Sequence, residues 1–146
     1  MSFLNSLNIT GSALTAERLR SDIILQNLAN QNTTRTADGG PYRRKQVVLR
    51  EQSLNFESQL TKAVKRQKGT SGGVIVEEVV ENQEDFVPVY DPTHPDADED
   101  GYVMMPNVNS SEEMVDLMAA SRAYEANLTA LNITKSMAMK ALEIGK

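Results

Sequence analysis

The acidic turn before residue 102 carries the residues best suited to hold a metal ion. Its carboxylates and glycine have the spacing of the first half of an EF-hand calcium loop: Asp96, Asp98, Asp100 and Gly101. The position that should supply the bidentate glutamate is Asn107, and the prolines around the turn exclude the flanking helices of an EF-hand. We therefore interpret the segment as an acidic surface turn and predict no metal site and no cofactor. A metal-dependent enzyme that uses residues 96–100 is the alternative.

Few other side chains are suited to chemistry. His94 is the only histidine, and the chain has no cysteine, which excludes thiol nucleophiles, disulfides and cysteine metal sites. The basic run at 43–45 could bind phosphate or form a solvated strand face. The basic residues at 62–68 could form a second basic patch or a soluble edge. There is no phosphate-binding glycine loop. These observations predict that the chain is not an enzyme.

The composition limits the classes of partner. The 146 residues include no tryptophan, and 5% are aromatic, so the core is expected to be modest. A net charge of −5 argues against a nucleic acid or an anionic membrane as partner. No apolar run approaches the ~20 residues needed to cross a bilayer, and no cleaved signal peptide is visible.

The C-terminal residues 110–146 are expected to form one long helix with two apolar stripes on nearly opposite sides. The first stripe is Leu117, Tyr124, Leu128, Leu131 and Leu142, and the second stripe is Val115, Ala119, Ala126, Ile133, Met137 and Ile144. Ser110 and Glu113 have the spacing of a capping box at its start. A helix that docks on one core needs a single apolar face, so two stripes predict burial between neighbours, as in a bundle or a multi-chain tube.

The N-terminal residues 1–32 show the same pattern in a second expected helix, from Phe3 to about Asn32. Its stripes are Leu7, Leu14, Leu25 and Leu28 on one side, and Ile9, Ala13, Ala16, Leu19 and Ile23 on the other. An Asn- and Gln-rich set follows near its end, including Asn27 and Asn30. These amides fit either a frayed helix end or a polar contact face that fixes how helices pair.

The middle region, 33–109, is expected to be β-rich with long loops. Strands are predicted at 42–50, 74–80 and 86–90, with Pro88 marking the last as an edge strand. Residues 91–109 are predicted to be an acidic loop punctuated by prolines. The expected fold is therefore mainly α, with a small β-rich insertion between two long terminal helices that pack as a coiled-coil pair and build a tubular assembly.

Several segments carry a resemblance to a known family. The segments are 12–16, 28–33, 34–45, 90–103 and 113–127. In combination they resemble the bacterial flagellar rod, hook and hook-associated proteins over nearly the whole chain, and among these a basal-body rod protein. The resemblance implies a structural subunit of the proximal rod that transmits torque through interlocked terminal helices. It also implies export through the flagellar type III apparatus without a cleaved signal, and assembly in the periplasm.

The implied partners are other rod proteins, further copies of the chain, and the MS-ring and export-gate side of the basal body. The predicted subunit-interface residues are Leu7, Leu14, Leu19, Ile23, Leu25, Asn27, Leu28, Asn30, Leu117, Tyr124, Leu128, Leu131, Ile133, Met137, Leu142 and Ile144. The alternative for the same helices is a soluble coiled-coil adaptor of a secretion system, which would form a closed, discrete complex.

Overall fold

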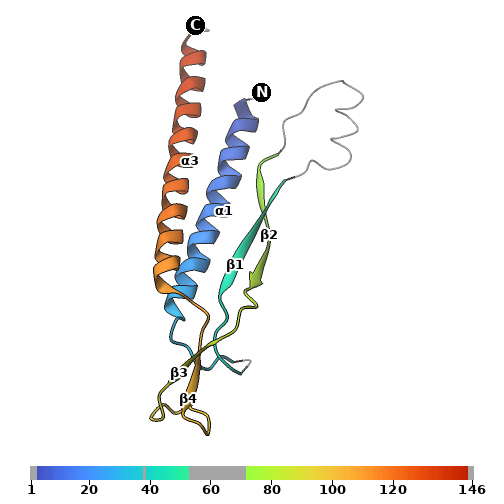
Figure 1. Ribbon diagram of the computed structural model, residues 1–146. Helices are drawn as coiled ribbons and strands as arrows, with labels where there is room; N and C mark the ends of the chain where they lie inside the picture. Colours follow the sequence, from blue (N-terminus) through green and yellow to red (C-terminus); the bar gives the residue numbers. More distant parts are fainter. Residues whose placement is uncertain (1–2, 38, 53–71, 145–146) are drawn as a thin grey trace, which may run out of the picture. The chain divides into compact units, whose positions relative to one another are not determined.

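The computed structural model describes residues 3–37, 39–52 and 72–144 (Figure 1). The elements are, in chain order, α1 (Phe3–Ala29), β1 (Lys45–Glu51), β2 (Val74–Glu81), β3 (Val87–Tyr90), β4 (Tyr102–Met105) and α3 (Ser110–Ile144). Two terminal helices and small antiparallel sheets confirm the coarse sequence prediction, which also placed strands close to β1, β2 and β3. The coiled-coil packing and the tube stay proposals. The basic segment 62–68 lies outside the described residues.

The chain divides into two compact units. One unit contains Met1–Arg18, Val48–Glu78 and Ser121–Lys146, and the other contains Leu19–Val47 and Val79–Ala120. Both helices and the strands β1 and β2 contribute to both units, whereas β3 and β4 belong to the second. The division into 1–32, 33–109 and 110–146 follows secondary structure instead, and it stays a prediction.

The start of α3 differs from the predicted capping box. Asn109 is the N-cap, because its Oδ1 accepts the backbone N–H of Ser111 at 3.0 Å. The backbone N–H of Glu113 donates to the Asn109 carbonyl at 3.0 Å, so Ser110 is already inside the helix. Asparagine caps at least as well as serine. The side chain of Glu113 is consequently free for another role.

Strands β1 and β2 form a two-stranded sheet. The N–H of Asn82 donates to the Arg44 carbonyl at 2.7 Å beyond one end, and the N–H of Gln52 donates to the Gly73 carbonyl at 2.8 Å beyond the other. Since the residue numbers on one strand fall as those on the other rise, the pairing is antiparallel. The side chains of Arg50 and Glu77 form an exposed ion pair across this sheet at 2.7 Å.

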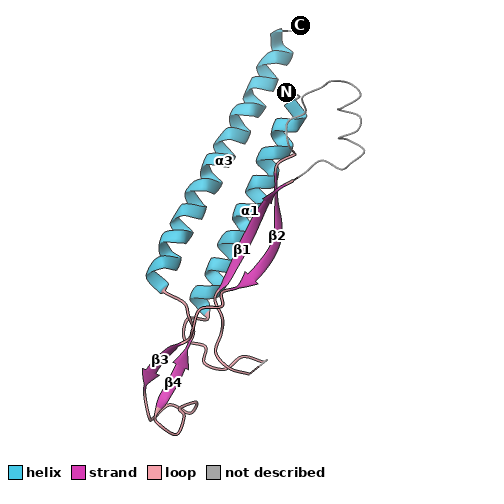
Figure 2. Ribbon diagram, turned by 45° about the vertical axis from the view of Figure 1, so that its right-hand side comes forward, coloured by secondary structure: helices cyan, strands magenta, loops and turns pink. Residues whose placement is uncertain are grey.

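Strands β3 and β4 form a second antiparallel sheet, with Val89 opposite Val103 and Tyr90 opposite Tyr102 (Figure 2). The predicted loop over 91–109 is wrong where β4 lies, because four residues of alternating burial are too short to stand out in a sequence. The acidic residues instead close the turn: Oδ1 of Asp98 accepts the N–H groups of Asp100 and Tyr102. Gly101 follows with φ of 81°, in the left-handed region that favours glycine.

The approach of β2 to α1 requires a glycine. The N–H of Val74 donates to Oγ of Ser12 at 3.0 Å, and a Cβ added to Gly73 would lie 2.3 Å from the same Oγ. Gly73 also has φ of 112°. Both the backbone conformation of Gly73 and its close contact with Ser12 therefore favour glycine at this position.

Gly73→Ala is expected to lower the free energy of unfolding by about 3 kcal/mol, measured by urea denaturation of the purified chain. The matched control is Gly40→Ala, which has φ of 90° but nothing within 4 Å of the added Cβ. The control should cost only the backbone strain, about 1 kcal/mol. Equal losses in the two variants would show that the contact with Ser12 adds nothing.

Candidate functional site

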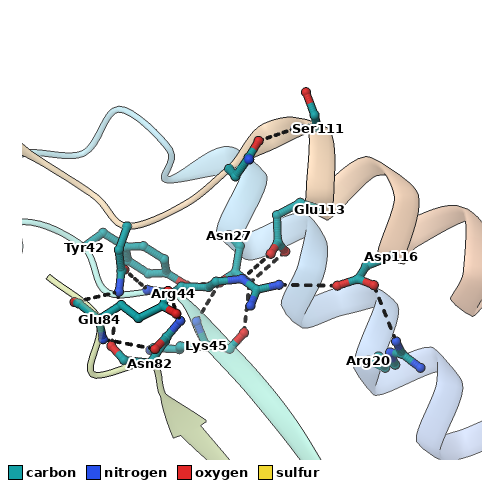
Figure 3. Close-up of polar contacts among 12 residues, drawn as sticks. Arg20, Asn27, Tyr42, Arg44, Lys45, Asn82, Glu84, Ser111, Glu113 and Asp116 are labelled. Atoms are coloured by element: carbon teal, nitrogen blue, oxygen red, sulfur yellow. Dashed lines mark hydrogen bonds and ion pairs between the residues drawn. The ribbon is translucent and has the colours of Figure 1, made fainter. Parts of the chain in front are cut away.

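A buried polar cluster joins the C-terminal end of α1, the start of β1 and the first turns of α3 (Figure 3). At its centre is Asn27, which is 1% exposed. Its Nδ2 donates to the Lys45 carbonyl and to Oε2 of Glu113, both at 2.9 Å. Its Oδ1 accepts from the Lys45 N–H at 3.0 Å and from the Tyr42 hydroxyl at 2.9 Å. All four hydrogen bonds that an asparagine amide can form are therefore made.

Of the two sequence interpretations of Asn27, the geometry supports the polar contact that fixes how helices pair, because the Asn27 amide of α1 donates to Glu113 of α3. A frayed helix end would leave the amide in water, whereas here it holds three separate segments together. A contact between subunits would need an accessible side chain, and Asn27 is covered by its own chain. The partners are 15 to 86 residues away in the sequence, which is why local patterning could not identify them.

Charged groups extend the cluster along α3. Glu113 is fully buried, with its Oε1 accepting a hydrogen bond from Nε of Arg44. The guanidinium of Arg44 also donates from Nη2 to Oδ2 of Asp116 at 3.3 Å. Arg20 of α1 pairs with the other Asp116 oxygen at 3.8 Å. A buried carboxylate is tolerated here because both of its oxygens accept hydrogen bonds and a guanidinium neutralises it.

The basic run 43–45 also serves the interior of its own chain. The N–H of Arg44 donates to Oδ1 of Asn107 at 2.9 Å, and Nδ2 of Asn107 donates to the Asn82 carbonyl at 3.2 Å. The guanidinium carbon of Arg43 lies 4.4 Å from the centre of the Phe86 ring, a cation–π contact. The solvated strand face that the sequence suggested is therefore wrong for Arg43 and Arg44, which are half-buried in contacts with their own chain.

Tyr42 is buried in the same cluster. Burial raises the pKa of its hydroxyl above the ordinary value, and the negative charges of Glu113 and Glu81 raise it further. The hydroxyl consequently stays protonated at neutral pH and can donate to Asn27. The cluster is thus a fixed set of donors matched to acceptors, which suits a structural joint.

Hydrogen bonds within the acidic turn, and one from Thr34, hold the turn in place. Oδ2 of Asp96 accepts from the Thr34 hydroxyl at 2.8 Å, and Nδ1 of His94 accepts from the Asp96 N–H. Hydrogen bonds from the hydroxyl and N–H of Thr93 hold the pKa of Asp91 below its ordinary value. Within the described ranges, no three His, Cys, Asp or Glu side chains are grouped as a metal ion would require.

The second candidate feature is the outer surface of α3. One face of this helix is covered at every turn, and its half-buried or buried residues are Glu113, Asp116, Leu117, Ala120, Ala123, Asn127, Ala130, Leu131, Thr134 and Ala138. These side chains are small or polar, apart from two leucines. The large apolar side chains are instead exposed: Met114, Val115, Met118, Tyr124, Leu128, Ile133, Met137, Met139 and Leu142. Exposed apolar surface of this extent is typical of partner-binding surfaces in general.

The predicted interface residues differ in exposure. Leu25, Tyr124, Leu128, Ile133, Met137 and Leu142 are exposed. Leu7, Leu14, Leu19, Ile23, Leu28, Asn30, Leu117 and Leu131 are half-buried within the chain. Asn27 is buried, and the side chain of Ile144 lies outside the description. The sequence analysis missed Met114, Met118 and Met139, although their helical spacing places them beside or between the two stripes.

Comparison with known proteins gives matches along the whole chain. The protein named flagellar basal-body rod protein FlgC from Bacillus subtilis is 49% identical, with both chains covered completely. The protein of the same name from Borreliella burgdorferi is 43% identical over 99% of this chain and 98% of its own, and that from Escherichia coli O6:H1 is 42% identical over the whole of both. This chain belongs to the FlgC family.

The family model described as flagellar basal body rod FlgEFG protein C-terminal also matches this FlgC-family chain, at residues 99–144. The matched range contains β4 and all of α3, and therefore both Glu113 and the exposed apolar side chains of α3. Membership of the FlgC family confirms the resemblance to flagellar rod and hook proteins. The chain is therefore a flagellar basal-body rod protein. Among the described residues of this family member, no helix is long and apolar enough to cross a membrane.

Proposed function

We propose that this FlgC-family chain is a structural, non-enzymatic subunit of the proximal rod, and that neighbouring subunits cover the apolar side chains of its terminal helices. The observation that carries the proposal is the second stripe of α3. Val115, Ile133 and Met137 are 60%, 50% and 66% exposed, along a helix whose covered face is small or polar apart from Leu117 and Leu131. A chain that functioned alone would be expected to place its large apolar residues on the covered face.

The free energy available from covering these residues is large. Full burial of one large apolar side chain contributes about 1.5–3 kcal/mol relative to exposure. The nine exposed side chains on α3 are already covered in part. Completing their burial would contribute on the order of 10 kcal/mol, before the entropy cost of association. Because association costs about 4–15 kcal/mol, a contribution of this size can offset most of that cost, and further contacts between subunits would add to it.

The polar cluster supports a role in transmitting torque. Hydrogen bonds from Asn27 to Glu113, and the ion pairs of Asp116 with Arg20 and Arg44, connect one end of α1 to one end of α3. A network in which each group is fully bonded permits one arrangement of these segments. Such a joint would keep the joined ends of α1 and α3 from sliding past each other while other subunits contact the apolar stripes of α3.

The proposal includes the remaining expectations from the sequence. The subunit is exported through the flagellar type III apparatus without a cleaved signal and assembles in the periplasm. Its neighbours are other rod proteins, further copies of itself and the basal-body base, with the terminal helices forming a tube. No nucleic acid takes part, which agrees with the net charge of −5.

Sedimentation of the purified chain, alone and with other rod proteins, tests this function. We expect a monomer in isolation and an open, growing stack only in the mixture. A soluble coiled-coil adaptor would instead give a closed oligomer of fixed mass, independent of the rod proteins. That second result would overturn the proposal.

A further inference from the structure

The methionines of this chain are gathered on β4 and on the exposed side of α3. Six of the seven lie between residues 104 and 139. Methionine is one of the residues that proteins most often bury, because its flexible side chain fills gaps in a core. The covered face of α3 nevertheless contains no methionine. All four methionines of this helix are exposed: Met114 at 58%, Met118 at 54%, Met137 at 66% and Met139 at 55%.

These residues belong to the surface that neighbouring subunits are proposed to cover. They are four of the nine large apolar side chains that α3 exposes. Met114 and Met118 are one helical turn apart, so their side chains lie on the same side of α3. The polar cluster fixes this turn, because buried Glu113 accepts a hydrogen bond from Asn27 of α1. A change in the polarity of the two methionines therefore cannot be relieved by rotating the helix.

The methionine sulfur is the one kind of atom on this surface that a mild oxidant changes reversibly, since the chain has no cysteine. A lone pair of the sulfur attacks one oxygen of hydrogen peroxide, the S–O bond forms, and the O–O bond breaks. The sulfur is oxidised by two electrons, and the second peroxide oxygen leaves as water. The product, methionine sulfoxide, is polar, and methionine sulfoxide reductases return it to the thioether.

Oxidation acts differently on a free chain and on a subunit in the rod. In the free chain the exposed side chains give the new oxygens access to water, and the covered face of α3 is unchanged. In the rod the same oxygens would be buried against apolar side chains without hydrogen-bond donors, which costs free energy. The surface is therefore sensitive to oxidation before assembly and shielded from it afterwards.

We propose that Met114, Met118, Met137 and Met139 form a reversible oxidation site that decides whether a free subunit can join the rod. Oxidised chains fail to enter the growing stack, and reduction of the sulfoxides restores their entry. This inference rests on the proposed rod function, because it needs neighbours that cover α3. It adds to that function a modification site through which peroxide controls the supply of assembly-competent subunits.

Sedimentation of the purified chain with other rod proteins, before and after treatment with hydrogen peroxide, tests the site. Peptide mass spectrometry counts the oxygens added at each methionine. We expect oxidation of all four α3 methionines and a fall in incorporation of about tenfold or more, with the melting temperature of the chain unchanged. Methionine sulfoxide reductases should remove the oxygens and restore incorporation. Incorporation that stays low after the oxygens are removed would overturn the inference.

Leucine substitutions separate the α3 methionines from those of β4. Leucine is similar to methionine in volume and has no sulfur, so a chain with all four α3 positions changed should assemble normally and resist peroxide. This quadruple variant is Met114→Leu/Met118→Leu/Met137→Leu/Met139→Leu. The matched control is Met104→Leu/Met105→Leu on β4, and its assembly should remain as sensitive to peroxide as that of the native chain.

Each other outcome contradicts a specific part of the proposal. A quadruple variant as sensitive to peroxide as the native chain would overturn the inference and leave the rod function standing. Resistance of the β4 variant would place the sensitive site outside α3, which also overturns it. Loss of the helical circular dichroism signal on oxidation would show that unfolding prevents assembly, against the inference. Failure of the unoxidised native chain to join any stack would instead contradict the rod function, and with it the inference.

Discussion

Replacing Glu113 with alanine is expected to lower the free energy of unfolding by about 3 kcal/mol, or roughly 10 °C in melting temperature. The carboxylate is fully buried and bonds both Asn27 and Arg44. Its removal leaves the Arg44 guanidinium, itself largely buried, with Asp116 as its remaining carboxylate partner. Urea denaturation followed by circular dichroism measures the loss.

Two further variants separate the charge pair from its individual groups. Asp116→Ala removes a carboxylate that is 41% exposed, so its cost should stay below about 1 kcal/mol. The double variant Glu113→Leu/Arg44→Met replaces both charges by apolar groups of similar volume. Part of the lost stability should return, because no buried charge is left unpaired, whereas one buried N–H of Asn27 still lacks its acceptor. If Glu113→Ala were no more costly than Asp116→Ala, the cluster would not be the joint described above.

Replacing Ile133 with aspartate is expected to abolish rod assembly and swimming while leaving the stability of the isolated chain within about 0.5 kcal/mol. Ile133 is exposed on the second stripe of α3, so a carboxylate there stays in water in the free chain. In the rod the same carboxylate would be buried without a partner, at a cost of several kcal/mol. Leu128→Asp tests the first stripe in the same way. Swimming in soft agar and the content of purified basal bodies report the effect.

Gln46→Asp is the control for both stripes. It introduces the same charge at an exposed position of β1, outside α3. Swimming should be close to normal. Normal swimming in both Ile133→Asp and Leu128→Asp would contradict the assignment of α3 as an assembly surface, and loss of swimming in Gln46→Asp would show that the effect is not specific to α3.

Local patterning was enough to predict the helices. The bounds Phe3–Ala29 and Ser110–Ile144 agree with the sequence prediction within three residues, because apolar spacing, Pro106 and an absence of breakers act over a few turns. The two stripes of α3 were read correctly as positions on the helix. Which stripe remains exposed depends on the rest of the fold, so sequence could not decide it.

The polar cluster could not be predicted in the same way. Asn27 and Glu113 are 86 residues apart, and each has a local explanation that is adequate by itself, a frayed helix end and a helix cap. Similarly, Arg44 lies in a basic run that looks like solvent-exposed charge. Only the close approach of three segments shows that these residues neutralise and hydrogen-bond one another. Strand β4 was missed because four residues between a turn and Pro106 give too short a pattern.

We propose that neighbouring subunits in the rod cover the apolar side chains that α3 exposes in the free chain. Single cysteines at Val115, Ile133 and Met137 allow a direct test, because a maleimide reagent would find no other thiol in the chain. We expect rapid labelling of all three in the purified monomer and strong protection in intact basal bodies. Labelling that is equally slow in the monomer, or equally fast in basal bodies, would contradict the claim.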